Sequence, residues 1–165
     1  MPDITEEKVA KVFMIILHNR ISSLFGCITL CLFAIVACSP NEYDDPVPYQ
    51  PFPDIILNLN LPENVGLKST GATLAVSGGV RGIIIYCKQA GVYVAYERNC
   101  SFHPNDACAT VNVDASTLFL IDPCCGSTFD LATGMPTGGV AIRPLVQYKT
   151  TYDGSVLIIT DERLD

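Results

Sequence analysis

Residues 122–148, DPCCGSTFDLATGMPTGGVAIRPLVQY, are the stretch of this sequence that decides its expected fold. Two adjacent cysteines, Cys124 and Cys125, stand near the start of the stretch, and glycines divide it into short segments. Glycine readily takes the positive φ angles of tight turns, so the pattern predicts loops and turns between short strands. Ser127 and Asp130 are of the type that orders such loops through hydrogen bonds to backbone amides. The two cysteines are therefore expected in an ordered loop.

The same stretch resembles the second half of a Rieske domain. In that family a Cys-Pro-x-His-Gly-Ser-x-Phe-Asp loop is followed by a glycine turn, a Gly-Gly-x-Ala-x-x-Pro-Leu loop and a tyrosine. The matching positions are Pro123, Gly126, Ser127, Phe129, Asp130, Gly134, Gly138, Gly139, Ala141, Pro144, Leu145 and Tyr148. The family's cysteine and histidine each bind one iron of a 2Fe-2S cluster, but here those slots hold Asp122 and Cys125. The resemblance implies the fold with degenerate cluster ligands.

An earlier segment, RNCSFHP at residues 98–104, resembles the first ligand loop of the same family. Cys100 stands at the position of the family's ligand cysteine. The histidine, His103, comes one residue late, and Phe102 takes its slot. One of the four ligand positions of the family is therefore intact.

Four cysteines in these two loops can form disulfides if the protein is exported, as residues 1–37 predict, because an exported protein meets an oxidising environment. Cys108 and Cys124 match the extra cysteines that a subset of the Rieske family joins by a disulfide. The resemblance therefore favours that pair first. Cys100 with Cys125 is the second pair that it favours. Four cysteines allow three pairings, and the sequence does not choose among them.

Two metal-binding alternatives stay open for the same loops. A 2Fe-2S cluster with altered ligands would draw on the donors Cys100, His103, Cys124 and Cys125. Thiolates suit such clusters, but adjacent cysteines project in different directions and the shifted histidine needs a remodelled loop. A mononuclear zinc site is the other option, although the spacing is a weak signal for it.

The rest of the sequence offers little catalytic chemistry. His103 is the only histidine after residue 37, and neither a Gly-x-Ser-x-Gly elbow nor a phosphate-binding glycine loop is present. Since no nucleophile and base can be paired, we do not expect an enzyme, and at most a redox or electron-transfer component. Cys87 is in phase with Ile83 and Ile85, so we expect a buried strand residue there.

Short apolar runs separated by Gly, Pro, Asn and Asp follow one another from residue 54 onward, which is typical of an all-β barrel or sandwich. In residues 92–97, Val94 and Tyr96 should share one face and Tyr93 and Ala95 the other, after a hairpin turn. The expected strands are 55–61, 72–76, 80–88, 92–97, 109–114, 117–121, 129–131, 147–152 and 156–160. With the resemblance, this predicts a small antiparallel Rieske-like barrel or sandwich carrying a subdomain of two cysteine loops.

Residues 1–37 are predicted to be a lipoprotein signal peptide. Residues 21–37 carry no charge, and the junction before Cys38 resembles a bacterial lipobox, so Cys38 is the expected lipidation site. A transmembrane anchor is the alternative, but the uncharged run is short for a bilayer core of roughly 30 Å. Residues 38–53 are rich in proline and predict an extended tether, whose end lies along the sheet edge by family resemblance. Residues 54–165 form the expected Rieske-like domain.

The acidic charge of the chain argues against a nucleic-acid partner. The chain has 10 Lys and Arg against 17 Asp and Glu, a formal net charge of −7, and phosphate binding needs clustered Lys and Arg. The chain resembles Rieske-like lipoproteins of the Bacteroidetes type, and we therefore expect it in the bacterial cell envelope, facing the periplasm or the cell surface. Its expected partners are the membrane, through the lipid anchor, and an envelope protein or redox partner. Two functions remain open: a non-catalytic module closed by disulfides, and a 2Fe-2S electron-transfer protein with altered ligands.

Overall fold

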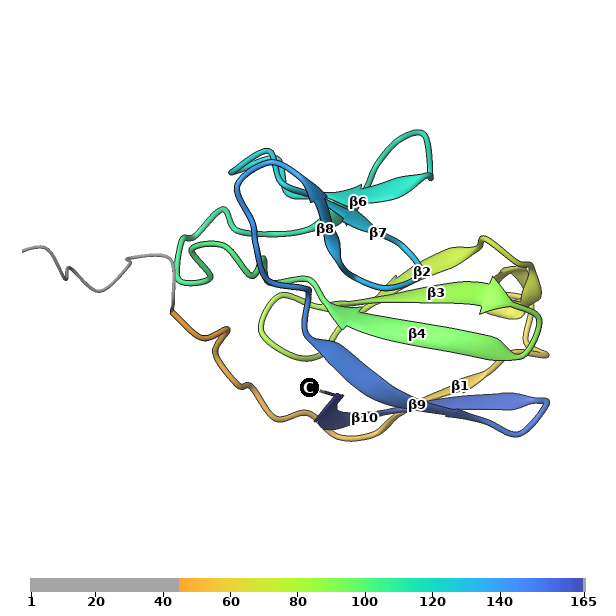
Figure 1. Ribbon diagram of the computed structural model, residues 1–165. Helices are drawn as coiled ribbons and strands as arrows, with labels where there is room; N and C mark the ends of the chain where they lie inside the picture. Colours follow the sequence, from red (N-terminus) through yellow and green to blue (C-terminus); the bar gives the residue numbers. More distant parts are fainter. Residues whose placement is uncertain (1–44, 165) are drawn as a thin grey trace, which may run out of the picture. The chain divides into compact units, whose positions relative to one another are not determined.

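Ten β-strands and one short 3-10 helix make up residues 45–164, the part of the chain that the computed structural model describes (Figure 1). The strands are β1 (Ile55–Asn58), β2 (Thr73–Val76), β3 (Ile83–Gln89), β4 (Val92–Glu97), β5 (Asn112–Val113), β6 (Phe119–Ile121), β7 (Thr128–Asp130), β8 (Pro136–Gly138), β9 (Gln147–Tyr152) and β10 (Val156–Leu164), and the helix is η1 (Val65–Lys68). The expected all-β fold is confirmed. None of the helical structure in these residues is long and apolar enough to cross a membrane. The predicted signal peptide, residues 1–37, and Cys38 lie outside the described residues.

The strands pair into two antiparallel sheets. The larger sheet has the strand order β1-β10-β9-β4-β3-β2, and the smaller has the order β5-β6-β7-β8. All four strands of the smaller sheet come from the chain between β4 and β9, which pair with each other in the larger sheet. The smaller sheet is therefore an insertion into the larger one, and Figure 1 shows it stacked over β2, β3 and β4.

Strands β3 and β4 are buried on both faces. On one face, Ile84, Val94 and Tyr96 pack against residues of the smaller sheet such as Leu120 and Phe129. Residues on the opposite face belong to a second apolar cluster within the larger sheet: Ile83, Ile85, Cys87, Tyr93 and Ala95. The alternation predicted for residues 92–97 is confirmed, and Cys87 is buried as expected. Strands β3 and β4 thus belong to the larger sheet and contribute residues to both apolar clusters.

Glycine turns account for one difference between expected and observed strands. The strand expected at 80–88 begins only at Ile83, because Gly79 (φ +58°) and Gly82 (φ +96°) belong to a turn. A Cβ at Gly79 would lie 2.0 Å from a carboxylate oxygen of Glu97, so this glycine permits a close approach of the backbone to that side chain. Glu97 becomes important for the site described below.

The remaining strand differences also have local causes. The strand expected at 109–114 shortens to β5, since residues 109–111 pair across the base of a loop. The strand expected at 156–160 continues to Leu164 past an irregularity in its pairing with β9. Strand β8 has no counterpart among the expected strands, because Pro136 and Gly138 are residues that strands rarely contain; it lies at a sheet edge, where proline is tolerated.

The described end of the proline-rich segment lies against β10. Arg163 donates from Nη1 to the carbonyl oxygen of Val47 at 3.1 Å, and its guanidinium group lies 5.0 Å from the ring centre of Tyr49. The Tyr49 hydroxyl donates to Asp161 Oδ2 at 2.6 Å. Residues 45–53 are thus fixed to the last strand, at the edge that β1 leaves uncovered.

Candidate functional site

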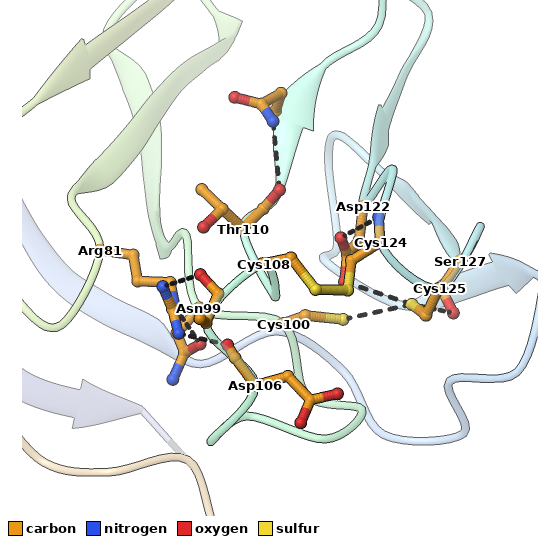
Figure 2. Close-up of a disulfide and its surroundings, with 12 residues drawn as sticks. Arg81, Asn99, Cys100, Asp106, Cys108, Thr110, Asp122, Cys124, Cys125 and Ser127 are labelled. Atoms are coloured by element: carbon orange, nitrogen blue, oxygen red, sulfur yellow. Dashed lines mark hydrogen bonds between the residues drawn. A yellow bond between two sulfur atoms is a disulfide. The ribbon is translucent and has the colours of Figure 1, made fainter.

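Two loops at one end of the smaller sheet carry four of the described cysteines. The first cysteine loop, residues 98–111, joins β4 to β5, and the second cysteine loop, residues 122–127, joins β6 to β7. The first is closed at its base by a hydrogen bond from Cys100 N to the Ala109 carbonyl oxygen at 3.1 Å. The second is closed by hydrogen bonds within the loop, including one from Asp122 N to the Ser127 carbonyl oxygen at 2.9 Å. Figure 2 shows that the tips of the two loops meet.

A disulfide joins the two loops through Cys108 and Cys124, whose Cα atoms are 5.6 Å apart (Figure 2). This is the pair that the resemblance favours first. It uses the sulfur of Cys124, which was also among the expected cluster ligands. Because a disulfide sulfur is no longer a thiolate, Cys124 is not available to bind metal in this state.

A second pair of cysteines lies beside the disulfide, and its sulfurs are not bonded. The Sγ atoms of Cys100 and Cys125 are 3.9 Å apart, and both residues are free cysteines. The second expected disulfide is therefore not formed in this structure. Cys100 is fully buried, and this burial raises the pKa of its thiol well above the ordinary value, with Asp122 adding to the rise. Cys100 is accordingly a protonated thiol at neutral pH rather than a free thiolate.

Asp122 completes a cluster of three donor groups. The side chain is fully buried, and its Oδ2 atom lies 3.2 Å from Cys125 Sγ. Its Oδ1 atom accepts a hydrogen bond from Cys124 N at 2.8 Å, which fixes the carboxylate in the loop. Donor atoms of Cys100, Asp122 and Cys125 all lie within 4.8 Å of one another. The sequence motif showed Asp122 in a ligand slot, but the expected donor set did not include it.

Ser127 connects this cluster to the Gly-Gly-x-Ala segment of the motif. Its Oγ atom accepts hydrogen bonds from the backbone amides of Val140 at 3.2 Å and Ala141 at 2.9 Å, and it lies 3.1 Å from Cys125 Sγ. Gly139 passes so close to the second loop that a Cβ there would lie 2.5 Å from Ser127 Cα. Ser127 and Gly139 therefore fix the position of Cys125 in the second cysteine loop.

The buried carboxylate of Glu97 anchors the other side of the site, and sequence analysis did not identify it. Glu97 accepts hydrogen bonds from the backbone amides of Val80 (2.8 Å), Arg81 (3.0 Å) and Asn99 (3.0 Å). The Tyr148 hydroxyl donates to it at 2.8 Å, and burial together with this bond raises the pKa of Tyr148. The position of Arg81 next to the first cysteine loop follows from these contacts.

Arg81 holds the first cysteine loop from outside. Its guanidinium group donates to Asn99 Oδ1 at 2.8 Å and to the carbonyl oxygens of Ala107 at 2.9 Å and Asp106 at 2.5 Å (Figure 2). These acceptors lie on either side of Cys100 and just before Cys108. The loop therefore presents its two cysteines in a fixed arrangement.

His103, the only expected nitrogen donor, is not part of the three-donor cluster. Its backbone has φ +45°, and its ring packs at 4.3 Å (between ring centres) against the Phe102 ring. Both rings lie on the wall of an open cavity of about 330 Å³. The cavity is lined by Phe102, His103, Asp106, Ala109, Asp122, Cys124, Cys125 and Val140.

The donor set does not fit a 2Fe-2S cluster. Such a cluster needs four protein donors, two for each iron. Among residues 45–164, the converging donors are two thiols and one carboxylate, while the sulfurs of Cys108 and Cys124 are bonded to each other. Of the four expected ligands, the structure thus brings Cys100 and Cys125 together. Cys124 is bonded to Cys108 instead, and His103 lies on the cavity wall.

Comparison with known proteins gives a limited result. No protein-family model matches the chain, and no curated protein matches it. The chain is similar to one in a solved structure described as a complex of reduced oxygenase and oxidized ferredoxin in carbazole 1,9a-dioxygenase. The two chains are 17% identical, and the match has a TM-score of 0.44 and covers 67% of this chain and 96% of that chain.

Proposed function

We propose that this chain is an envelope-anchored lipoprotein with a non-catalytic Rieske-like domain, which serves as a structural or interaction module. In this proposal the cluster site is degenerate and is closed by a disulfide. The observation that carries it is the incomplete donor set: where the motif locates the cluster, two thiols and one carboxylate converge among the described residues, and a 2Fe-2S cluster needs four donors. The fully buried Asp122 supports it further, since this carboxylate fills a ligand slot and hydrogen-bonds within its own loop.

The disulfide supplies the order that a metal cluster would otherwise give to these loops. The bridge closes a chain segment with a sequence separation of 16. In the chain-entropy model, a loop of this length corresponds to a stabilisation of about 3 kcal/mol. Two loops that are tied to each other, to Arg81 and to the backbone amide of Ala141 therefore keep their shape without iron.

Anchoring to the bacterial cell envelope is the second part of the proposal. It rests on the uncharged residues 21–37 followed by Cys38, the pattern of a lipoprotein signal. The partners we propose are the membrane, through the lipid on Cys38, and an envelope protein that binds the exposed surface of the domain. Palmitate labelling of the full-length protein in a bacterial host tests the anchor, and we expect Cys38→Ala to abolish the label.

A 2Fe-2S electron-transfer protein is the second candidate function. The observation in its favour is that Cys100 and Cys125 meet at the place where the motif locates the cluster. It ranks second because a cluster needs four donors, whereas three converge among the described residues and the disulfide withdraws Cys124 from the expected set.

Iron analysis separates the two candidates. The full-length protein, purified under anaerobic conditions, is assayed for iron, acid-labile sulfide and visible absorbance. We expect no stoichiometric iron or sulfide and no visible bands. Two iron and two sulfide per chain, with visible absorbance that Cys100→Ser removes, would establish the electron-transfer function instead.

A further inference from the structure

The three-donor cluster has the dimensions of a site for one tetrahedral metal ion. Zinc binds thiolate sulfur at about 2.3 Å, so two thiolates on one tetrahedral zinc lie about 3.8 Å apart. The Sγ atoms of Cys100 and Cys125 are 3.9 Å apart. The two thiols therefore already stand at the separation of two ligands on a single ion.

The carboxylate of Asp122 has the reach of a third ligand. With zinc–oxygen bonds of about 2.1 Å, a carboxylate oxygen and a thiolate on the same tetrahedral ion lie roughly 3.6 Å apart. Asp122 Oδ2 is 3.2 Å from Cys125 Sγ, and the donors of all three residues lie within 4.8 Å of one another. A movement of a few tenths of an ångström at Asp122 would open the centre of the cluster to the ion.

The surroundings of the cluster also suit a bound ion. The Oδ1 atom of Asp122 stays bonded to Cys124 N, so the carboxylate is oriented from outside the site, as the ligands of metal sites commonly are. Asp122 and Cys125 line the open cavity of about 330 Å³, which gives an entry path and room for a fourth ligand. Two thiolates and one carboxylate favour zinc over the hard cations calcium and magnesium.

We infer that Cys100, Asp122 and Cys125 form a mononuclear zinc site, with the fourth coordination position facing the cavity. Binding converts both thiols to thiolates and releases their protons to solvent. The disulfide beside the site fixes the two loops and leaves this thiol pair as the binding group. The inference rests on the two-loop geometry and does not depend on the membrane anchor.

Zinc titration of the full-length protein tests this site. The protein is purified without reduction of its disulfide, stripped with a chelator under anaerobic conditions and titrated with zinc chloride against a chromophoric chelator. We expect one zinc per chain, and at least a tenfold weaker affinity for Cys125→Ser and for Asp122→Asn. Cobalt chloride in place of zinc should give thiolate-to-cobalt charge-transfer absorbance, and Cys125→Ser should reduce it.

Matched variants separate a loss of zinc ligation from a loss of folding. Cys87→Ser removes a buried thiol far from the site and should retain one zinc per chain with unchanged affinity. Asp122→Asn keeps an acceptor for Cys124 N, so its loss of affinity would reflect lost ligation rather than a disordered loop. Thermal unfolding of each variant without metal checks that it folds.

Three results would overturn the inference: less than one zinc per chain in protein whose Cys100 and Cys125 are both free thiols, an affinity that neither Cys125→Ser nor Asp122→Asn changes, or a Cys100–Cys125 disulfide in the purified protein. Each of these leaves the proposed structural role intact. Stoichiometric iron and sulfide in the protein as isolated would instead contradict the proposed function. The two failures are therefore distinguishable.

Discussion

Asp122 determines, at the scale of single residues, how the second cysteine loop is held. Its Oδ1 atom satisfies the Cys124 amide, and its Oδ2 atom faces the Cys125 sulfur. A hydrogen bond of this kind contributes about 0.5–1.5 kcal/mol to stability. The carboxylate therefore has a structural role in the metal-free loop and a ligand role in the inferred zinc site.

Replacement of Asp122 separates these two roles. We expect Asp122→Ala to lower the free energy of unfolding by about 1 kcal/mol, because it removes the acceptor of the hydrogen bond that the Cys124 amide donates. Asp122→Asn should cost less, since its amide oxygen can accept the same hydrogen bond. Urea denaturation in the presence of a chelator measures both values. Equal losses for the two variants would show that the hydrogen bond to Cys124 contributes little.

Glu97 supports the site indirectly, through hydrogen bonds to backbone amides next to the first cysteine loop. Glu97→Ala removes a fully buried carboxylate and leaves three backbone amides without an acceptor, one buried and two part-buried, so we expect a loss of about 3 kcal/mol or more. Tyr148→Phe removes only the hydroxyl that donates to Glu97 and should cost about 1 kcal/mol. Chemical denaturation tests the order of the two variants. A smaller loss for Glu97→Ala than for Tyr148→Phe would contradict the anchoring role.

Buried tyrosines predict a loss of stability at alkaline pH. Burial raises the pKa of Tyr93 from 10.0 to about 12, and Cys87 and Tyr152 add to the rise. Since the unfolded chain loses this proton first, the contribution is complete below pH 10 and disappears as the pH rises to about 12. The free energy of unfolding should therefore fall over that range, and less steeply in Tyr93→Phe. Identical slopes for the two proteins would reject this assignment.

The two cysteine loops form the element on which the candidate site depends. Their order comes from one disulfide, from the contacts of Arg81 with the first loop, and from the hydrogen bond that Ala141 N donates to Ser127 of the second loop. None of these contacts involves a metal. The loops are consequently expected to remain folded after chelation.

Removal of the disulfide tests this arrangement at the same scale. We expect Cys108→Ala to lower the free energy of unfolding by about 3 kcal/mol. The double variant Cys108→Ala/Cys124→Ala should lose little more, because the bridge is already absent in the single variant. Denaturation under non-reducing conditions gives both values. A single-variant loss below about 1 kcal/mol would mean that the bridge does not order the loops.

At the element scale, sequence pattern predicts strands well where apolar residues alternate and poorly where glycine or proline intervenes. Residues 92–97 alternate, and β4 forms there as expected. Strand β8 contains Pro136 and Gly138, which give no strand signal, and its pairing with β7 provides the missing stabilisation. The end of β10 depends on pairing with β9, which local pattern does not encode.

The candidate site could be predicted only in part, for a geometric reason. The resemblance to the Rieske family implied that the two loops meet and favoured Cys108 with Cys124. The separation of Cys100 and Cys125 depends on the backbone bonds at the loop bases, which sequence spacing does not determine. The inward orientation of Asp122 likewise results from its bond to Cys124 N, so its place in the donor cluster became visible only in three dimensions.

At the scale of the whole molecule, the cysteine site is part of an insertion that shares its core with the larger sheet. Tyr96 and Ile84 face the smaller sheet, whereas their neighbours Ala95 and Ile85 face the second cluster. Because β3 and β4 serve both clusters, the two sheets should unfold together. The cysteine loops are thereby built on a rigid support rather than on a separate flexible module.

The proposed anchor limits how far this domain extends from the membrane. Residues 45–53 are held against β10 by Arg163 and Asp161, so they do not act as a free spacer. Only residues 38–44 then separate the proposed lipid on Cys38 from the domain, and a fully extended segment of that length spans at most about 25 Å. Under the proposed function, the domain would remain close to the bilayer surface.

Disulfide mapping of the full-length protein tests the central claim most directly. The protein is purified anaerobically, denatured with a chelator, alkylated without reduction, digested and analysed by mass spectrometry. We expect a peptide pair linked through Cys108 and Cys124, together with alkylated Cys87, Cys100 and Cys125. Alkylated Cys108 and Cys124, or a bridge from either one to Cys100 or Cys125, would show that the two loops are not closed in this way.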